Sequence, residues 1–397
     1  MVQAEVNIGM LGHVDHGKTT LTEKLTGKWT GTHSEEIKRG ISIRLGYAEL
    51  SIYYCQNCKK YANSENCSDC KSKGEFKRKI SFIDAPGHET LMTTVIAASS
   101  ILDGALFLIS ANEVCPQPQT IEHLIVLNSI GIKNIVVVQT KVDLVSKEKA
   151  LENYAQIKEL LKGTVAEKAP IIPVSANYNV NLELLIEAIE ETIPTPKRDE
   201  KAPLKIFISR SFDVNKPGTA IAKLRGGVIG GSVVQGVLKI GDEIEIKLGV
   251  AQKENEMPIP IKCKVLSLME EKETIEEAKP GGLIAIGTSI DPALTKSDAL
   301  IGSVIGHVGG LPEATSTAKV KYELIKRKDM ENPPLKMEEI LAININTATT
   351  VGVVTNLAKG IATIKLKKPI VYDKSARVAL SRKFGQRWKL AGWGSLV

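Results

Sequence analysis

The sequence lacks any hydrophobic run long enough to cross a membrane. None of the apolar stretches in its 397 residues approaches the roughly 20 residues that a spanning helix requires. Residues Met1 to Glu5 lead directly into a predicted strand, without the charged and apolar regions of a leader sequence. We therefore expect neither a signal peptide nor a membrane anchor.

Cysteine is also scarce. Six cysteines in a chain of this length are too few for a disulfide scaffold, and four of them crowd into residues 55–70. A reducing cytoplasm is the simplest compartment for such a chain. Cys115 and Cys263 are isolated in the sequence, and we predict that they are packing residues.

The C-terminal part of the chain has few acidic residues. From Glu313 to Val397 there are 16 Lys and Arg against 7 Asp and Glu, a net charge of +9, which leaves −2 for the preceding residues in a total of +7. This asymmetry indicates contact with an RNA backbone, although a solvated lysine face accounts for such a balance nearly as often.

The composition is otherwise that of a globular protein, 43% hydrophobic and 24% charged, and the length predicts two to four domains. In the first half, short β-branched runs alternate with helical patterns, which is typical of a doubly wound, mostly parallel α/β sheet. The predicted strands are 6–11, 79–84, 104–110, 134–139 and 170–174. The predicted helices are 19–26, 89–101, 120–130, 147–162 and 181–193.

A stretch rich in proline and charge ends this pattern and predicts an interdomain linker. After it, strand-like runs are separated by Gly and Pro turns at the spacing of β-barrels, with a join at 305–317. The expected strands are 205–212, 227–235, 242–247, 259–268 and 283–287, then 319–325, 339–346, 351–356, 361–366, 376–381 and 388–393. The predicted domains are 1–196 (α/β), 204–312 (β-barrel) and 313–397 (β-barrel), with the linker at 197–203.

Residues 12–19, GHVDHGKT, fit the G-x-x-x-x-G-K-[ST] pattern of a phosphate-binding loop and lie between a predicted strand and a predicted helix. In such a loop the backbone N–H groups converge on the phosphates, Lys18 reaches the terminal ones, and the Thr19 hydroxyl ligates magnesium. The alternative is a glycine-rich turn that happens to contain Gly-Lys-Thr.

Three further elements follow predicted strands. Asp84 can hold magnesium, usually through water, and Gly87 can offer a backbone N–H to the terminal phosphate. Residues 140–143, TKVD, resemble a guanine-reading element in which an aspartate, here Asp143, accepts two hydrogen bonds from guanine. Residues 175–177, SAN, fit an element whose backbone N–H meets the guanine carbonyl. Taken alone, Asp84 could equally be a turn former, residues 140–143 a salt pair and Ser175 a helix cap. Together with the phosphate loop, the four elements in this order predict a GTP site.

Two C-x-x-C knuckles lie eight residues apart, in a polar stretch. Their thiolates, Cys55, Cys58, Cys67 and Cys70, match the tetrahedral ligand set of a closed, structural zinc site. A redox pair needs only one such knuckle and a helical setting, so we favour zinc; reduced thiols without metal are the remaining alternative.

The phosphate loop, the stretch 33–43 and residues 84–89, DAPGHE, resemble the translational GTPases related to elongation factor Tu. This resemblance implies that His88 orients the attacking water as the catalytic residue, and that Val14 and Ile41 form a hydrophobic gate before it. It implies magnesium ligation by Thr19, Ser42 and Asp84, and more weakly by Asp15 and Gly40. The nucleotide-binding residues expected from the motifs are Asp15, His16, Gly17, Lys18, Thr19, Thr20, Gly87, Thr140, Lys141, Val142, Asp143, Ser175, Ala176 and Asn177.

The knuckle insertion, the stretches 210–219 and 226–232, and the basic residues 376–388 resemble the gamma subunits of archaeal and eukaryotic translation initiation factor two. The resemblance implies a GTP-dependent carrier of methionylated initiator tRNA to the small ribosomal subunit, which hydrolyses GTP on start-site commitment. It also implies alpha and beta subunits as partners. One position departs from the family pattern: Thr140 stands where an Asn is usual, which puts the support of the phosphate loop in question.

Two other readings stay open at this point. In one, hydrolysis is negligible and the nucleotide stabilises an RNA-binding scaffold. In the other, the chain is a selenocysteine-specific elongation factor or the GTPase subunit of a sulfate-activating complex, which the zinc knuckles disfavour. The expected fold is an α/β phosphate-loop GTPase domain with a zinc-knuckle insertion followed by two β-barrels, and the expected cofactors are GTP or GDP, Mg²⁺ and Zn²⁺.

Overall fold

The computed structural model describes residues 2–31, 45–88, 91–248, 257–271, 273–327, 331–373, 376–385 and 387–397. Val2–Pro196 and Lys197–Val397 form two compact units, which are described separately below. Across the described part of the chain, no helix is both long and apolar enough to pass through a membrane.

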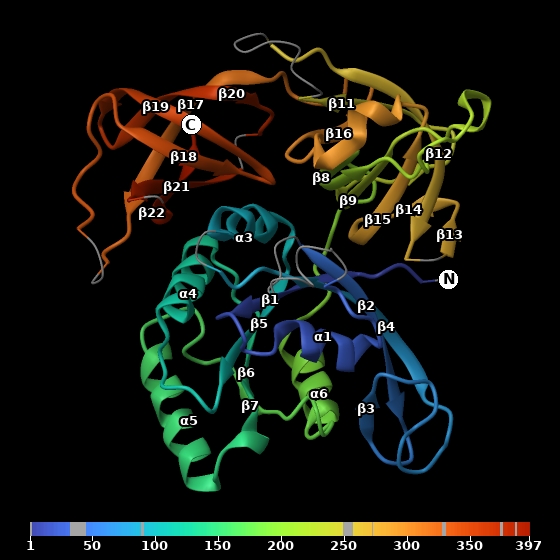
Figure 1. Cartoon of the computed structure of the whole chain (residues 1–397), viewed down its shortest axis with the longest axis vertical. Coiled ribbons are helices and arrows are strands. Elements are labelled where there is room, and N and C mark those ends of the chain that lie inside the picture. Colours follow the sequence, from blue (N-terminus) through green and yellow to red (C-terminus); the bar gives the residue numbers. More distant parts are fainter. Residues whose placement is uncertain are drawn as a thin grey trace. The chain divides into compact units, whose positions relative to one another are not determined.

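A seven-stranded mixed sheet forms the centre of the first unit, in the order β3-β2-β4-β1-β5-β6-β7 (Figure 1). Strands β4, β1, β5, β6 and β7 run parallel, whereas β2 and β3 run antiparallel to their neighbours. The strands are β1 (Val6–Gly12), β2 (Gly46–Cys55), β3 (Lys60–Ala62), β4 (Glu75–Asp84), β5 (Gly104–Ser110), β6 (Ile135–Thr140) and β7 (Ile171–Pro173).

Helices cover both faces of this sheet, with α4 and α5 on one side and α1 and α6 on the other (Figure 1). Every residue of β1, β5 and β6 is buried, as expected for parallel strands covered twice. Leu21 of α1 and Leu185 of α6 lie in the same hydrophobic cluster as Ile8 and Val136 of the sheet. The helices are α1 (Lys18–Thr26), α3 (Met92–Ala98), α4 (Pro118–Ile130), α5 (Lys147–Leu161) and α6 (Leu182–Thr192), with 3-10 turns η2 (Ser99–Ile101) and η3 (Val142–Leu144).

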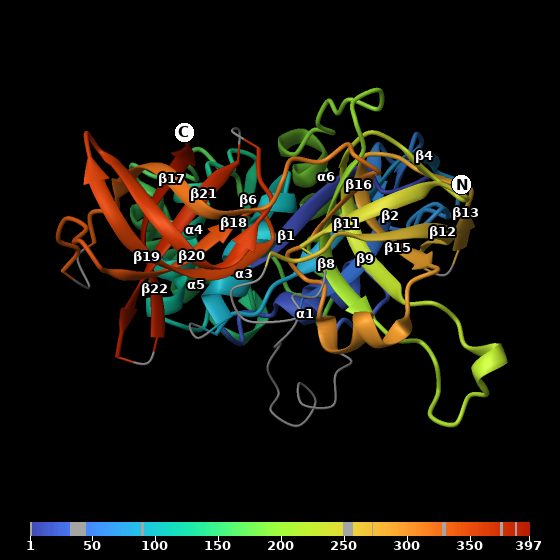
Figure 2. The same ribbon diagram turned by 90° about the horizontal axis from the view of Figure 1, so that it is seen from above.

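The second unit contains two β-barrels. In the first, the strand order β11-β16-β8-β9-β15-β12 closes because β11 also pairs with β12. The connection between β8 and β9 carries η4 (Ile221–Lys223) and extends away from the strands (Figure 2). The strands are β8 (Lys205–Phe212), β9 (Val228–Gln235), β10 (Leu238–Lys239), β11 (Glu243–Lys247), β12 (Ile261–Glu270), β13 (Glu273–Ile275), β14 (Glu277–Ala278), β15 (Gly281–Thr288) and β16 (Val304–His307), with η5 at Pro292–Asp298.

The second barrel is closed in the order β17-β20-β19-β18-β21-β22. Along β20 buried residues alternate with more accessible ones, so one face of the strand lines a core that includes Ile364 and Leu366. The strands are β17 (Thr315–Leu324), β18 (Ile340–Ile345), β19 (Ala348–Ala358), β20 (Ile361–Ile370), β21 (Arg377–Phe384) and β22 (Arg387–Leu396).

The predicted fold class is confirmed: a mixed α/β domain is followed by two barrels. Several element predictions were wrong in detail. The join expected at 305–317 begins inside β16 and ends inside β17, because a four-residue strand is too short to give a periodic signal. Of the helix expected at 89–101, the described residues 91–101 are regular over α3 and continue as the 3-10 turn η2. The strands that were not predicted are β2, β3, β10, β13, β14 and β16.

Candidate functional site

The loop between β1 and α1 requires glycine at both of its ends. Gly12 has φ 148° and Gly17 has φ 82°, and a Cβ on Gly12 would lie 2.4 Å from the Leu108 carbonyl oxygen. Gly17 is the N-cap of α1, so the free N–H groups of the first helical turn face the loop. This arrangement fits an anion such as a phosphate group.

Lys18 is buried inside the loop. Its Nζ donates to the carbonyl oxygens of Gly12 at 3.0 Å and His13 at 2.7 Å. Burial lowers the pKa of Lys18 to about 8, while the carboxylates of Asp84 and Asp15 act in the opposite direction. At neutral pH the side chain therefore remains mostly protonated, and a phosphate would supply the counter-charge that a buried ammonium requires.

Asp84 ends β4 directly beside this loop. The hydroxyls of Thr19 and Thr30 each donate to Asp84 Oδ2 at 2.7 Å. Carboxylate and hydroxyl oxygens are the ligands that Mg²⁺ prefers, so this group fits a magnesium ion held with substrate phosphates. Thr30 was not predicted, because it lies in an irregular segment after α1 that matches no motif.

The turn after Asp84 packs closely on the phosphate loop. A Cβ on Gly87 would lie 2.6 Å from Lys18 Nζ and 2.8 Å from the Val14 nitrogen, so only glycine fits there. His88 follows and is partly buried. Gln119 of α4 also reaches the loop, since its Oε1 accepts from the Val14 N–H at 3.4 Å. Gln119 was missed because a lone glutamine near the start of a helix carries no motif.

His16 is directed into the protein. Its Nδ1 lies 2.9 Å from the Leu108 carbonyl oxygen, and Nε2 lies 3.5 Å from Glu113 Oε2. Burial lowers the pKa of His16 to about 4, so the ring is neutral at pH 7 and Nδ1–H donates to Leu108. This contact and the one described next fix the middle of the phosphate loop.

Thr140 ends β6 and contacts the phosphate loop. Its hydroxyl donates to the His16 carbonyl oxygen at 2.9 Å, and both groups are buried. The Thr140 side chain therefore ties this strand end to the loop. Lys141 follows with φ 57°, and Asp143 in η3 is exposed at this edge of the sheet.

Ser175 starts a tight turn after β7. It forms an isolated β-bridge with Val180, with N···O distances of 2.9 and 3.3 Å. The enclosed turn leaves Ala176 partly buried and Asn177 exposed. Among the described residues the buried Ser175 hydroxyl has no hydrogen-bond partner.

All four predicted elements follow the carboxyl ends of parallel strands, and these ends share one edge of the sheet. The phosphate loop follows β1, Asp84 ends β4, Thr140 ends β6, and Ser175 follows β7. Gly40, Ile41 and Ser42 lie outside the described residues, as does Glu89.

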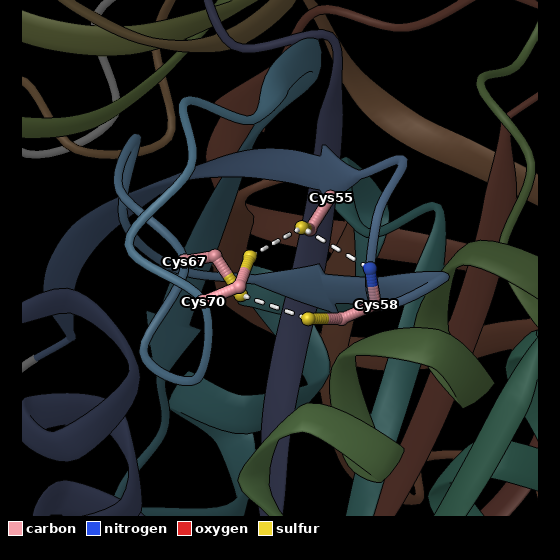
Figure 3. Close-up of side chains that lie close together, drawn as sticks. All are labelled: Cys55, Cys58, Cys67 and Cys70. Atoms are coloured by element: carbon pink, nitrogen blue, oxygen red, sulfur yellow. Dashed lines mark hydrogen bonds between the residues drawn. The ribbon is translucent and has the colours of Figure 1, made fainter.

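The four cysteines of the knuckles bring their sulfur atoms together (Figure 3). All four lie within 4.8 Å of one another, with Cys55 Sγ 3.5 Å from Cys70 Sγ and Cys67 Sγ 3.8 Å from Cys58 Sγ. A tetrahedral zinc site with Zn–S bonds of about 2.3 Å has S···S edges of about 3.8 Å, which these separations match.

The two knuckles share a backbone pattern. The residue after the second cysteine of each, Lys59 and Lys71, has a positive φ of 55° and 60°. Both knuckles therefore turn through a left-handed residue directly after their second cysteine. The N–H of Cys58 also donates to Cys55 Sγ at 3.5 Å. Four convergent thiols without a disulfide fit a single metal ion.

Comparisons with known families agree with this site. Residues 3–195 match the model of the elongation factor Tu GTP-binding domain, and residues 316–396 match the model of the C-terminal domain of initiation factor eIF2 gamma. Curated relatives named translation initiation factor 2 subunit gamma are 53% identical. The alignment with the Methanococcus vannielii protein spans 100% of this chain and 99% of that protein. The alignment with the Pyrococcus horikoshii protein spans 99% of this chain and 97% of that protein.

Solved structures share the fold. The crystal structure of a bacterial selenocysteine-specific elongation factor aligns with a TM-score of 0.76 and 26% identity over 100% of this chain, which spans 58% of that structure. The elongation factor SelB of Methanococcus maripaludis, in complex with the GTP analogue GppNHp, aligns with a TM-score of 0.74 at 21% identity, over 100% of this chain and 79% of that one.

The curated relatives match this chain over its full length at 53% identity, well above the identity of these solved structures. The chain therefore belongs to the translation initiation factor 2 gamma subunits, a family of GTP-dependent initiation factors with a translational GTPase domain.

Proposed function

We propose that this GTPase carries methionylated initiator tRNA to the small ribosomal subunit while GTP is bound, and releases it after hydrolysis on start-site commitment. The observation that carries the proposal is the convergence of Lys18, Asp84 and Thr140 on one sheet edge, in a chain with gamma-subunit relatives over its full length. The proposal includes alpha and beta subunits of the same factor as partners and a cytoplasmic location. It keeps the domain division at 1–196, 204–312 and 313–397, with the linker at 197–203.

Each predicted residue has a role in this proposal. Lys18 and the N–H groups of the loop bind the phosphates, and Gly87 offers its N–H to the terminal one. Asp143 accepts from the guanine N1–H and amine, while the stem of Lys141 covers the ring. The remaining loop and strand-end residues predicted from the motifs line the same nucleotide.

Magnesium fits the oxygen atoms of Thr19 and Asp84, with Ser42 as a further hydroxyl ligand and Asp15 and Gly40 at a second position. When bound, Mg²⁺ neutralises charge that develops on the phosphates. His88 orients the water that attacks the terminal phosphate, and Val14 and Ile41 keep it away from the water until activation.

The terminal phosphate orders the stretch 33–43 and the turn at 84–89, and hydrolysis removes the contacts that hold them. This change would control the affinity of the factor for the tRNA. Zinc fits Cys55, Cys58, Cys67 and Cys70 as a closed structural site with no open coordination position.

Binding measurements with initiator and elongator methionyl-tRNA test the carrier proposal directly. We expect tight binding only for the initiator tRNA with a non-hydrolysable GTP analogue, and weak binding for the elongator tRNA or with GDP. Equal binding in all four combinations would defeat the proposal.

The hydrolysis step is tested by single-turnover GTP cleavage with the partner factors and small ribosomal subunits present. His88→Ala should lower the rate by about 10²-fold or more, the size of a lost general-base or water-orienting contribution. A wild-type chain that cleaves no faster than His88→Ala under these conditions would leave nucleotide as a static ligand of an RNA-binding scaffold.

A further inference from the structure

The cysteine knuckle contacts the helix that follows the phosphate loop. The Asn63 side-chain amide, directly after β3, donates to the carbonyl oxygens of Lys24 at 3.3 Å and Leu25 at 3.1 Å. These carbonyls belong to the last turn of α1, whose first turn carries Lys18 and Thr19. One short helix therefore joins the knuckle to the phosphate loop.

The last carbonyls of a helix have no partner within the helix, so other groups must satisfy them. In α1 the Gly27 N–H bonds to the Glu23 carbonyl, and Asn63 supplies a donor to the next two. Helix α1 is only nine residues long, and helices of this length depend on tertiary contacts to hold their position. Asn63 is such a contact at the end opposite the nucleotide.

A second helix of the nucleotide domain also meets the knuckle (Figure 1). Ser68 Oγ donates to Glu183 Oε1 at 2.8 Å, and Lys60 Nζ lies 3.5 Å from Glu183 Oε2. Glu183 is in the first turn of α6, just after the turn that begins at Ser175. These exposed contacts are individually weak. Tyr61 of β3 adds apolar packing against the core cluster that α1 and α6 share.

We infer that the four-cysteine knuckle is a brace for the nucleotide site, and that Asn63 is a positioning residue which holds α1 so that Lys18 and Thr19 stay in place for the phosphates. This inference rests on the proposed GTP site. If α1 is less constrained at its far end, the loop has more freedom without nucleotide, and binding must overcome that additional disorder. Weakening the brace therefore speeds nucleotide release.

The test measures dissociation of a fluorescent GDP analogue from the full chain, together with zinc content. Asn63→Ala removes the donor, and Asn63→Asp replaces it with a carboxylate beside the negative end of the helix dipole. We expect release to be about two- to tenfold faster for Asn63→Ala, the size of one lost capping contact, and faster again for Asn63→Asp. Zinc content should stay at the wild-type value.

Asn57 provides a matched control within the same knuckle. Its Nδ2 donates to Ser72 Oγ at 2.8 Å, a contact that does not involve α1. Asn57→Ala should release the GDP analogue at the wild-type rate. General loosening of the knuckle would not make Asn63→Asp release the GDP analogue faster than Asn63→Ala. That difference between the two variants is therefore specific to the contact with the helix end.

The possible failures can be told apart. A wild-type chain that does not bind the GDP analogue contradicts the proposed function itself. A wild-type chain that binds it, with Asn63→Ala and Asn63→Asp releasing it at the wild-type rate and retaining zinc, overturns the brace alone. Equal acceleration by Asn57→Ala would also overturn the assignment to Asn63.

Discussion

Thr140 contributes one hydroxyl that spans two parts of the nucleotide site. It lies at the end of β6, next to the residues expected to read guanine, and it donates to the His16 carbonyl of the phosphate loop. An asparagine at this position has two donors, whereas threonine has one. In this chain the single threonine hydroxyl makes the contact between the strand end and the loop.

Replacing Thr140 by valine keeps the shape of the side chain and removes the donor. The buried His16 carbonyl would then lack this partner, which costs about 1–3 kcal/mol. We expect Thr140→Val to release GDP up to about tenfold faster, as measured by displacement of a fluorescent analogue. Thr347→Val is the control, because among the described residues the buried Thr347 hydroxyl has no hydrogen-bond partner. Unchanged GDP release from Thr140→Val would show that the tie does not support the site.

Lys18 gives the nucleotide-free protein a distinct pH dependence. Its pKa is lowered from 10.5 to about 8, so between these values the unfolded chain binds more protons than the folded one. The free energy of unfolding should therefore rise as the pH increases from about 8 to 10.5. Lys18→Met should remove this rise and stabilise the nucleotide-free chain at pH 7 by up to about 3 kcal/mol.

Denaturant unfolding of both proteins across this pH range measures the difference. The same substitution should weaken GDP binding strongly, because it removes the charge that faces the phosphates. If Lys18→Met leaves the pH profile of unfolding unchanged, the lysine is not destabilised by burial in the folded protein.

At the scale of elements, the knuckle is the part most dependent on a ligand. It contains one three-residue strand, and its four cysteine sulfur atoms lie together where a single metal ion could join them. We expect about one zinc ion per chain. Replacing Cys67 by serine, or removing zinc with a chelator, should lower the free energy of unfolding of residues 2–196 by several kcal/mol. Elemental analysis and thermal unfolding give the two values.

Cys115→Ala serves as the control for that experiment, because Cys115 is buried far along the chain from the knuckle and belongs to no group of metal ligands in the described residues. It should retain zinc. A wild-type chain that contains far less than one zinc when purified would leave the knuckle as a set of reduced thiols.

The sequence predicts those elements best whose surroundings leave a simple pattern. Strands β1, β5 and β6 are buried on both faces and read as continuous apolar runs, so their positions were predicted within one residue. Strand β2 has one buried face, marked by Ala48, Leu50 and Ile52, and the aromatic and polar residues between them make its alternation less distinct than a continuous apolar run.

The motifs predicted which strand ends carry the site, and the structure brings those ends to one edge. Contacts made by side chains outside motifs could not be predicted. Thr30 and Gln119 reach Asp84 and Val14 only because the chain folds back on itself, and neither residue type is distinctive in its local sequence. The tie from Thr140 to the phosphate loop joins residues 124 positions apart, so it too required the fold.

At the scale of the whole molecule, each part of the chain has its own core. In the described part of the chain, buried residues such as Ile8 and Val136 cluster within 2–196, and each barrel is built around a cluster of its own. A ligand bound in the first unit stabilises the elements that contact it. The stability of the barrel cores changes only if the barrels unfold together with the first unit.

Hydrogen exchange with and without GDP tests this independence. Peptides from β1, α1 and β6 should gain protection on nucleotide addition, whereas β12 and β20 should exchange at unchanged rates. The control is Lys18→Met, in which the same GDP concentration should protect none of these peptides. Equal protection of the barrel strands in the wild-type chain would show that the two units unfold as one.

The strand lengths have a consequence for how the folded chain meets other copies of itself. The edges of the mixed sheet are β3 and β7, and β13 is the outermost strand attached to the first barrel. Each of these three is three residues long, and the ring of the second barrel has no edge. Short edges offer few free N–H and C=O groups to another chain. Strand β3 pairs with Tyr53, Tyr54 and Cys55 of the ten-residue strand β2, so the knuckle covers that end of β2 against pairing with another chain.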